Sequence, residues 1–216
     1  LGIDKSMVIS YGQDDRVCAF AGIKAIFETQ KPEYTSVTLC VDKEETGSYG
    51  NTGMHSKFFE NTVAELINLQ GNYSDLKIKR AMAKSRVLSG DVNAAYDPNF
   101  SSAYEKANSA HLGGGVAIMK YSGSRGKSGT SDANAEFVCE VRRTFNKENV
   151  VWQTGELGKV DQGGGGTVAY ILANYGAEVL DCGVGLLSMH APYEVASKAD
   201  IFEMYRGYKA FLNINL

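Results

Sequence analysis

The side chains that could carry chemistry in this chain are carboxylates and one imidazole, and they come from separate segments. They are Asp14, Asp15, Glu44, Glu45, Asp91 and His190. The first two begin a predicted helix, and the others follow predicted strands. Because ligands of open α/β sheets collect at the carboxyl ends of the strands, we expect these side chains to meet at one edge of a sheet. Carboxylates and an imidazole without a thiolate suit Zn, Mn or Co held for catalysis, whereas structural zinc favours cysteine.

Each candidate also has an interpretation that involves no metal ion. Asp14 could cap its helix, and Asp91 could cap a turn. Glu44 and Glu45 could form a solvated acidic loop, and His190 could be a hydrogen-bonded histidine of the core. However, two adjacent acids after a buried strand, followed by Thr-Gly-Ser, can both be aimed inward by the loop. Taken together, the set favours a metal site over the separate alternatives.

Helices and strands alternate along the sequence, and this alternation predicts an α/β protein. Apolar residues at helical spacing predict helices over 14–27, 57–69, 133–145, 166–175 and 193–212. Apolar and β-branched runs predict strands over 36–41, 85–89, 115–120, 150–153 and 178–184. This spacing is typical of βαβ units, so we expect a mostly parallel sheet covered by helices on both faces.

Composition excludes several classes of protein. The chain has 216 residues, 44% hydrophobic and 22% charged, which is ordinary for a globular domain. Its net charge of −3 gives no reason to expect nucleic acid. No apolar run approaches the roughly 20 residues that span a bilayer, so we expect no membrane partner.

The cysteine pattern predicts free thiols. The four cysteines, Cys18, Cys40, Cys139 and Cys182, lie far apart and form no Cys-x-x-Cys pair. We interpret them as buried free thiols in a reducing compartment. With no signal-peptide pattern at the start of the sequence, this predicts a cytoplasmic location.

Four segments resemble the M18 aminopeptidases, the aspartyl aminopeptidase and aminopeptidase I group, and they occur in the right order. They are 11–26 (YGQDDRVCAFAGIKAI), 41–53 (VDKEETGSYGNTG), 89–100 (SGDVNAAYDPNF) and 187–200 (LSMHAPYEVASKAD). The neighbouring M42 family shares the Asp-Asp-Arg and Glu-Glu signatures, but the long gap from Glu45 to Asp91 and the closing Ser-Met-His fit M18 better. The resemblance implies a three-layer α/β/α sandwich with a mostly parallel mixed sheet, as in zinc exopeptidases.

The same resemblance implies a ligand set for two divalent ions. Asp14 would bridge the two ions, and Asp15 would hold it from behind. Glu45 and His190 would complete one site, and Asp91 would be a ligand of the other. A bridging carboxylate suits such a pair because it offsets the repulsion between two cations about 3.5–4 Å apart. Zinc is the expected metal, with cobalt or manganese as alternatives.

The reaction implied by the resemblance is hydrolysis of the N-terminal residue of a peptide. Glu44 would be the general base, taking a proton from a water held between the ions and returning it to the leaving amine. Lys120, after the predicted strand over 115–120, would sit near the substrate. The family also implies a homo-oligomer, built from dimers into a dodecamer.

The sequence departs from the family pattern in two ways. The family takes a further ligand from a His-x-Asp segment upstream of Asp14, and neither His55 nor His111 matches it. Both histidines lie in polar loops, and we assign them to the surface. The β-rich domain that family members insert before Asp14 is also missing. We therefore expect residues 1–216 to be one domain, the C-terminal part of a metallopeptidase catalytic domain. Two alternatives remain: an inactive fragment or assembly module, and an M42-type peptidase or deacylase on the same fold.

Overall fold

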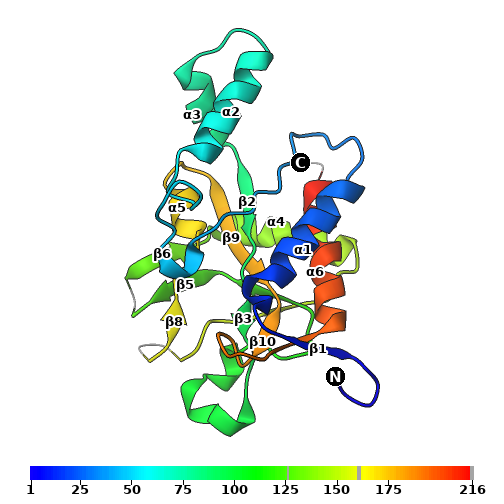
Figure 1. Ribbon diagram of the computed structural model, residues 1–216. Helices are drawn as coiled ribbons and strands as arrows, with labels where there is room; N and C mark the ends of the chain where they lie inside the picture. The colour runs from blue at the N-terminus through cyan, green and yellow to red at the C-terminus, as the bar shows by residue number, and fades with distance from the viewer. Residues whose placement is uncertain (126, 160–161, 215–216) are drawn as a thin grey trace.

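Three sheets form the β-structure of the computed structural model, which describes residues 1–125, 127–159 and 162–214 (Figure 1). The central sheet contains, in spatial order, β2 (Arg86–Ser89), β9 (Glu178–Gly183), β4 (Val116–Met119) and β7 (Trp152–Thr154). A second sheet contains β1 (Met7–Ser10), β11 (Glu194–Ser197), β10 (Gly185–Leu187) and β3 (Asn93–Ala94). The third contains β6 (Ser128–Asp132), β5 (Tyr121–Ser124) and β8 (Gly164–Gly165).

Helices pack around these sheets. The α-helices are α1 (Gln13–Glu28), α2 (Phe58–Leu69), α3 (Asp75–Ala83), α4 (Ala135–Lys147), α5 (Ala169–Ala173) and α6 (Lys198–Leu212). Short 3-10 helices are η1 (Glu44–Thr46), η2 (Pro98–Ala103) and η3 (Lys106–Asn108). Helices α1 and α6 lie side by side, and α2 and α3 form a hairpin that projects from one end of the molecule (Figure 1). None of the described helices is long and apolar enough to cross a lipid bilayer.

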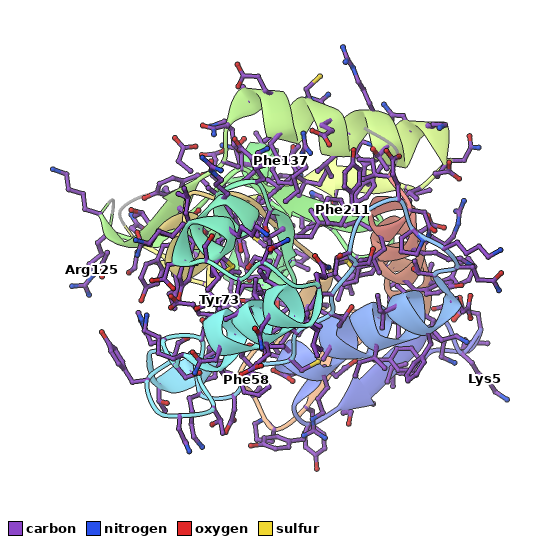
Figure 2. All side chains as sticks on the ribbon, turned by 90° about the horizontal axis from the view of Figure 1, so that it is seen from above. Lys5, Phe58, Tyr73, Arg125, Phe137 and Phe211 are labelled. Atoms are coloured by element: carbon purple, nitrogen blue, oxygen red, sulfur yellow. The ribbon has the colours of Figure 1, made fainter. Side chains whose placement is uncertain are left out.

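Two hydrophobic cores lie on opposite faces of the central sheet. Successive residues of a strand point to opposite faces. Accordingly, Leu180 belongs to the core beneath α1, α4 and α6, whereas its neighbour Val179 packs with Leu172 of α5. In the larger core the rings of Phe137 and Phe211 meet edge to face with centroids 6.3 Å apart, joining α4 to α6 (Figure 2). Helices therefore cover both faces, and the predicted α/β/α arrangement is observed.

The central sheet is mixed and mostly parallel, as predicted: β9 pairs parallel with β2, β4 pairs parallel with β7, and β4 pairs antiparallel with β9. The two smaller sheets are mostly antiparallel. Of the eight strand pairings in the described part of the chain, three are parallel and five antiparallel. One cause is that residues 194–197, predicted as the start of a long helix, form β11 and pair with β1 and β10. The hydroxyl of Ser197 then accepts the N–H of Asp200 at 3.3 Å, and α6 begins only after this cap.

The predicted strand over 36–41 is wrong. Within the described residues this segment is extended but joins no strand ladder. Its hydroxyl groups make the connections instead: Thr38 donates to the carbonyl of Gly22 at 3.2 Å, and Ser36 donates to that of Leu212 at 3.1 Å. A β-branched run becomes a strand only where a neighbouring strand accepts its backbone hydrogen bonds.

The prediction of buried cysteines holds for half of them. Cys18 and Cys182 are buried in the core, whereas Cys40 and Cys139 are exposed. Cys40 lies on the extended segment without a ladder, and Cys139 lies on α4 outside the buried face that Phe137 begins.

Candidate metal centre

Three candidate ligands from distant parts of the chain converge at one point. The carboxylate Oδ2 of Asp14 lies 3.0 Å from Nε2 of His190, and Oε1 of Glu45 lies 3.2 Å from the same nitrogen. One ligand atom from each residue lies within 4.8 Å of the others. The Asp14 side chain is 8% exposed, whereas Glu45 is 58% and His190 63% exposed. The group thus has a buried base and an open side.

A second group shares one member with the first. Carboxylate oxygens of Asp14, Asp15 and Asp91 also lie within 4.8 Å of one another. Asp14 therefore belongs to both groups, which is the position that a carboxylate serving two cations would occupy. All-carboxylate surroundings on one side and carboxylate plus imidazole on the other suit divalent ions.

The start of α1 places Asp14 and Asp15 outside regular helix geometry. Gly12 has φ +68°, a left-handed conformation that glycine adopts without steric cost. Asp14 (φ −77°, ψ 107°) and Asp15 (φ −116°, ψ 36°) are non-helical, and the peptide bond between them is cis. The two acids lie at a bend within the first turn of α1, and both face the acidic cluster.

A tight loop presents the glutamate pair. Glu44 and Glu45 lie in the single turn η1, flanked by left-handed Lys43 (φ 70°) and Gly47 (φ 90°). The N–H of Ser48 donates to the carbonyl of Lys43 at 2.7 Å and closes the loop. The backbone of the loop reverses direction here, and this reversal places the Glu45 side chain beside His190.

Asp91 owes its place to a glycine on the adjacent strand. A Cβ added to Gly183 would lie 1.7 Å from the carbonyl oxygen of Asp91. Only glycine allows the chain after β2 to pass so close to β9, and Asp91 is carried towards Asp14 by that approach.

Burial and mutual repulsion raise the pKa values of these acids. Burial, and then the charge of Glu45, raises the pKa of Asp14 to about 6 and that of Glu44 to about 7. Burial also raises the pKa of Asp15 and that of Asp91 well above the ordinary value, with neighbouring carboxylates adding to the effect.

The residues present fit divalent metal ions. The charges of several carboxylates oppose one another in a partly desolvated space, and cations there would remove the repulsion. In addition, Oδ1 of Asp15 is buried and has no hydrogen-bond partner among the described residues. The chemistry of the donor set and this unpartnered oxygen both favour a cation.

The other predicted residues lie in different surroundings. Lys120 directly follows β4, and its ammonium group pairs with the carboxylate of Asp132, so a role towards substrate stays a prediction. His111 is exposed. His55 is half-buried rather than on the surface: its ring stacks on Tyr49, and its Nε2 lies 3.0 Å from the hydroxyl of Tyr170.

Two buried carboxylates near the site were not singled out from the sequence. Asp181 on β9 is 2% exposed and accepts hydrogen bonds from Ser122 at 2.6 Å and Thr167 at 2.7 Å. Glu194 on β11 is 2% exposed and bonds to the backbone at Asp14. For Asp181 the available signal was a charged residue inside an apolar strand, which is buried only when hydrogen-bonded. Glu194 gave no such signal, because it is the first residue of β11.

Comparison with known proteins gives a match along nearly the whole chain. A family model described as aminopeptidase I zinc metalloprotease (M18) matches residues 1–212. A probable M18 family aminopeptidase 1 from Clostridium acetobutylicum is 59% identical over 212 residues, covering 98% of this chain and 46% of that protein. One from Thermotoga maritima is 43% identical over 213 residues, covering 98% and 47%. The chain thus spans about half the length of the curated relatives it matches.

Solved structures give the same result for the fold. Aminopeptidase I from Clostridium acetobutylicum superposes with a TM-score of 0.91 at 57% identity, covering 99% of this chain and 46% of that one. The M18 aminopeptidase from Thermotoga maritima gives 0.95 at 42% identity, covering 99% and 47%. The dodecamer of Saccharomyces cerevisiae mApe1 gives 0.80 at 24% identity, covering 98% and 47%, and supports the fold alone.

Proposed function

Because the chain belongs to the M18 family of zinc metalloproteases, we propose that it carries most of the metal centre of an aminopeptidase, which removes the N-terminal residue of peptides. The observation that carries this proposal is the convergence of Asp14, Glu45 and His190 on one point. Residues 1–216 would then be one domain, the C-terminal part of the catalytic domain.

Two groups of side chains would hold the ions. Asp14, Glu45 and His190 would bind one, and Asp14 with Asp91 would contribute to a second. Zinc fits the carboxylate and imidazole donors, and cobalt or manganese would fit the same set. When bound, divalent ions polarise a peptide carbonyl and make a water molecule more acidic. Asp15 would hold the side chain of Asp14 in place from the side away from the ions.

Glu44 is the residue we propose as general base. It is next to Glu45 in the chain, yet it belongs to neither group of converging ligand atoms, so its carboxylate stays free to accept a proton. It lies close enough to Asp14 and Glu45 for their charges to raise its pKa, which places it at the same acidic cluster. A general base so placed would take a proton from water and pass it to the leaving amine.

The experiment for this proposal is hydrolysis of an aminoacyl-p-nitroanilide panel with added Zn²⁺, Co²⁺ or Mn²⁺. Glu44→Gln should bind the metal like the parent chain but lose the metal-dependent release. Glu65→Gln, at an exposed position on α2, should behave like the parent. Release that survives Glu44→Gln would contradict the role of Glu44.

A second candidate function is a metal-binding module that needs another segment or chain for catalysis. Residues 1–216 contain no His-x-Asp segment that could complete the second group of ligands, and this favours such a module. Zn²⁺ binding without release of p-nitroaniline would support this candidate over an active peptidase.

Self-association is also part of the proposal. Large apolar side chains are exposed along α1, among them Phe20 (59%) and Phe27 (82%), and such surface favours contact with another chain. These exposed side chains of α1 would then contact another copy of the chain in a homo-oligomer. Apart from other copies of itself, this chain would bind peptide substrates. Its cytoplasmic location stays a prediction.

A further inference from the structure

One buried carboxylate is bonded to the backbone of two candidate metal ligands. Oε2 of Glu194 accepts the N–H of Gln13 at 2.6 Å and the N–H of Asp14 at 3.2 Å. Oε1 of the same side chain accepts the N–H of His190 at 2.8 Å. Glu194 is 2% exposed, so these bonds are shielded from water. A single side chain thus ties the start of α1 to the turn that carries the imidazole.

Glu194 is itself held in place. It begins β11, where it is paired with Ser10 of β1. The side-chain amide of Gln13 donates to the carbonyl of Glu194 at 2.5 Å and to that of Val8 at 3.2 Å, which fixes both strands to the start of α1. The carboxylate therefore stands on a rigid base.

The turn that bears His190 needs such a partner. Ser188 (φ 58°) and His190 (φ 66°) are both left-handed, and the N–H of Ala191 donates to the carbonyl of Ser188 at 3.0 Å. Residues other than glycine are uncommon in this conformation and persist where the surrounding structure holds them. The bond from the His190 N–H to Glu194 ties this turn to the second sheet.

We propose that Glu194 is a positioning residue of the metal centre, fixing the distance between the Asp14 carboxylate and the His190 imidazole. This inference rests on the proposed function. A carboxylate is needed because it accepts on both oxygens, and its charge strengthens bonds from backbone N–H groups. A glutamine would accept on one side and turn its NH₂ group towards N–H donors on the other.

Asp200 offers a matched control. It is fully buried and accepts the N–H of Gly113 at 2.7 Å and the N–H of Gly115 at 2.8 Å. The loop that it holds carries none of the candidate ligands. Asp200→Asn therefore removes the same kind of bond from a buried carboxylate without touching the metal centre.

The test compares Zn²⁺ affinity of the parent chain with Glu194→Gln, Glu194→Asp and Asp200→Asn by calorimetric titration. Loss of an outer contact to a metal ligand typically weakens binding about 10- to 100-fold, and we expect this for Glu194→Gln. Glu194→Asp keeps both acceptor oxygens and should lose less. It also carries the test if the glutamine variant does not fold. Asp200→Asn should bind like the parent.

Amide hydrogen exchange in the metal-free chains gives a second readout. Glu194→Gln should speed exchange at the N–H of His190 or at those of Gln13 and Asp14, and Asp200→Asn should not. Parent-like Zn²⁺ affinity in Glu194→Gln, or an equal loss in Asp200→Asn, would overturn the positioning role alone. A parent chain that binds no Zn²⁺ would overturn the proposed function and the positioning role together.

Discussion

The carboxylate of Asp14 lies 3.0 Å from Nε2 of His190, although the two residues come from opposite ends of the chain. Asp14 lies at the bend in the first turn of α1, and His190 lies in the turn after β10. The antiparallel pairing of β1 with β11 and of β11 with β10 brings these two places together. The second sheet therefore positions the candidate metal centre as much as the central sheet does.

Stability of the metal-free chain should rise as the pH falls from about 7.5 to about 4.5. The folded chain raises the pKa of Asp14 from 3.8 to about 6 and that of Glu44 from 4.5 to about 7, so it binds these protons more tightly than the unfolded chain. The stabilisation is therefore present at low pH and lost as the pH rises through 6 and 7. We expect about 2 kcal/mol after allowance for solvent screening.

Urea unfolding in EDTA at several pH values measures this effect. Saturating Zn²⁺ should reverse the trend, because metal binds the deprotonated carboxylates. If the stability of the metal-free chain instead fell steadily as the pH was lowered from 7.5 to 4.5, the raised pKa values of Asp14 and Glu44 would be contradicted. Below that range Glu28, whose pKa is lowered to about 2 by Lys24, Tyr205 and Lys209, favours unfolding as it becomes protonated.

Zinc stoichiometry should separate the two groups of ligands. Asp91→Asn should remove the weaker of two binding steps and leave the tighter one. Asp14→Asn should weaken both steps, because Asp14 belongs to both groups. Equilibrium competition with a chelating dye would count the ions. Asp181→Asn, which changes a buried carboxylate outside both groups, should leave both steps in place, and loss of the tight step in Asp91→Asn would contradict the assignment.

Gly183→Ala should destabilise the fold by about 3 kcal/mol, since its Cβ would lie 1.7 Å from the carbonyl oxygen of Asp91. Gly185→Ala is the matched control on the next strand, where the atom nearest to the new Cβ is the Cβ of Ala95, at 3.3 Å. Urea unfolding of both variants measures the difference. Equal stabilities would show that the approach of Asp91 to β9 is not tight.

Sequence reasoning identified five of the six described α-helices, the four strands of the central sheet and the side chains of the candidate site, because each depends on local pattern. It did not predict α3 or the strands of the two smaller sheets. The helix over 133–145 and the strand over 178–184 correspond to α4 and β9 within two residues. The acids Asp14, Glu45 and Asp91 stand out as charges beside apolar runs, and their roles stay a prediction.

The failures involve contacts between distant segments. Nothing local distinguishes β11 from the helix that follows it, since its pairing with β1 comes from the far end of the chain. The segment over 36–41 has the composition of a strand but no ladder in the described structure. Glu194 was missed for the same reason, because its value lies in bonds to Asp14 and His190 that only the fold creates.

The central claim is that Asp14, Glu45 and His190 form a zinc site, and calorimetric Zn²⁺ titration of His190→Ala tests it most directly. His111→Ala is the control, because His111 is exposed and lies outside both groups of ligands. We predict that His190→Ala weakens the tight binding step by more than the roughly 10- to 100-fold typical of losing an outer contact, because a direct ligand is lost, and that His111→Ala leaves it unchanged. Equal Zn²⁺ affinity in the parent and His190→Ala chains would contradict the account.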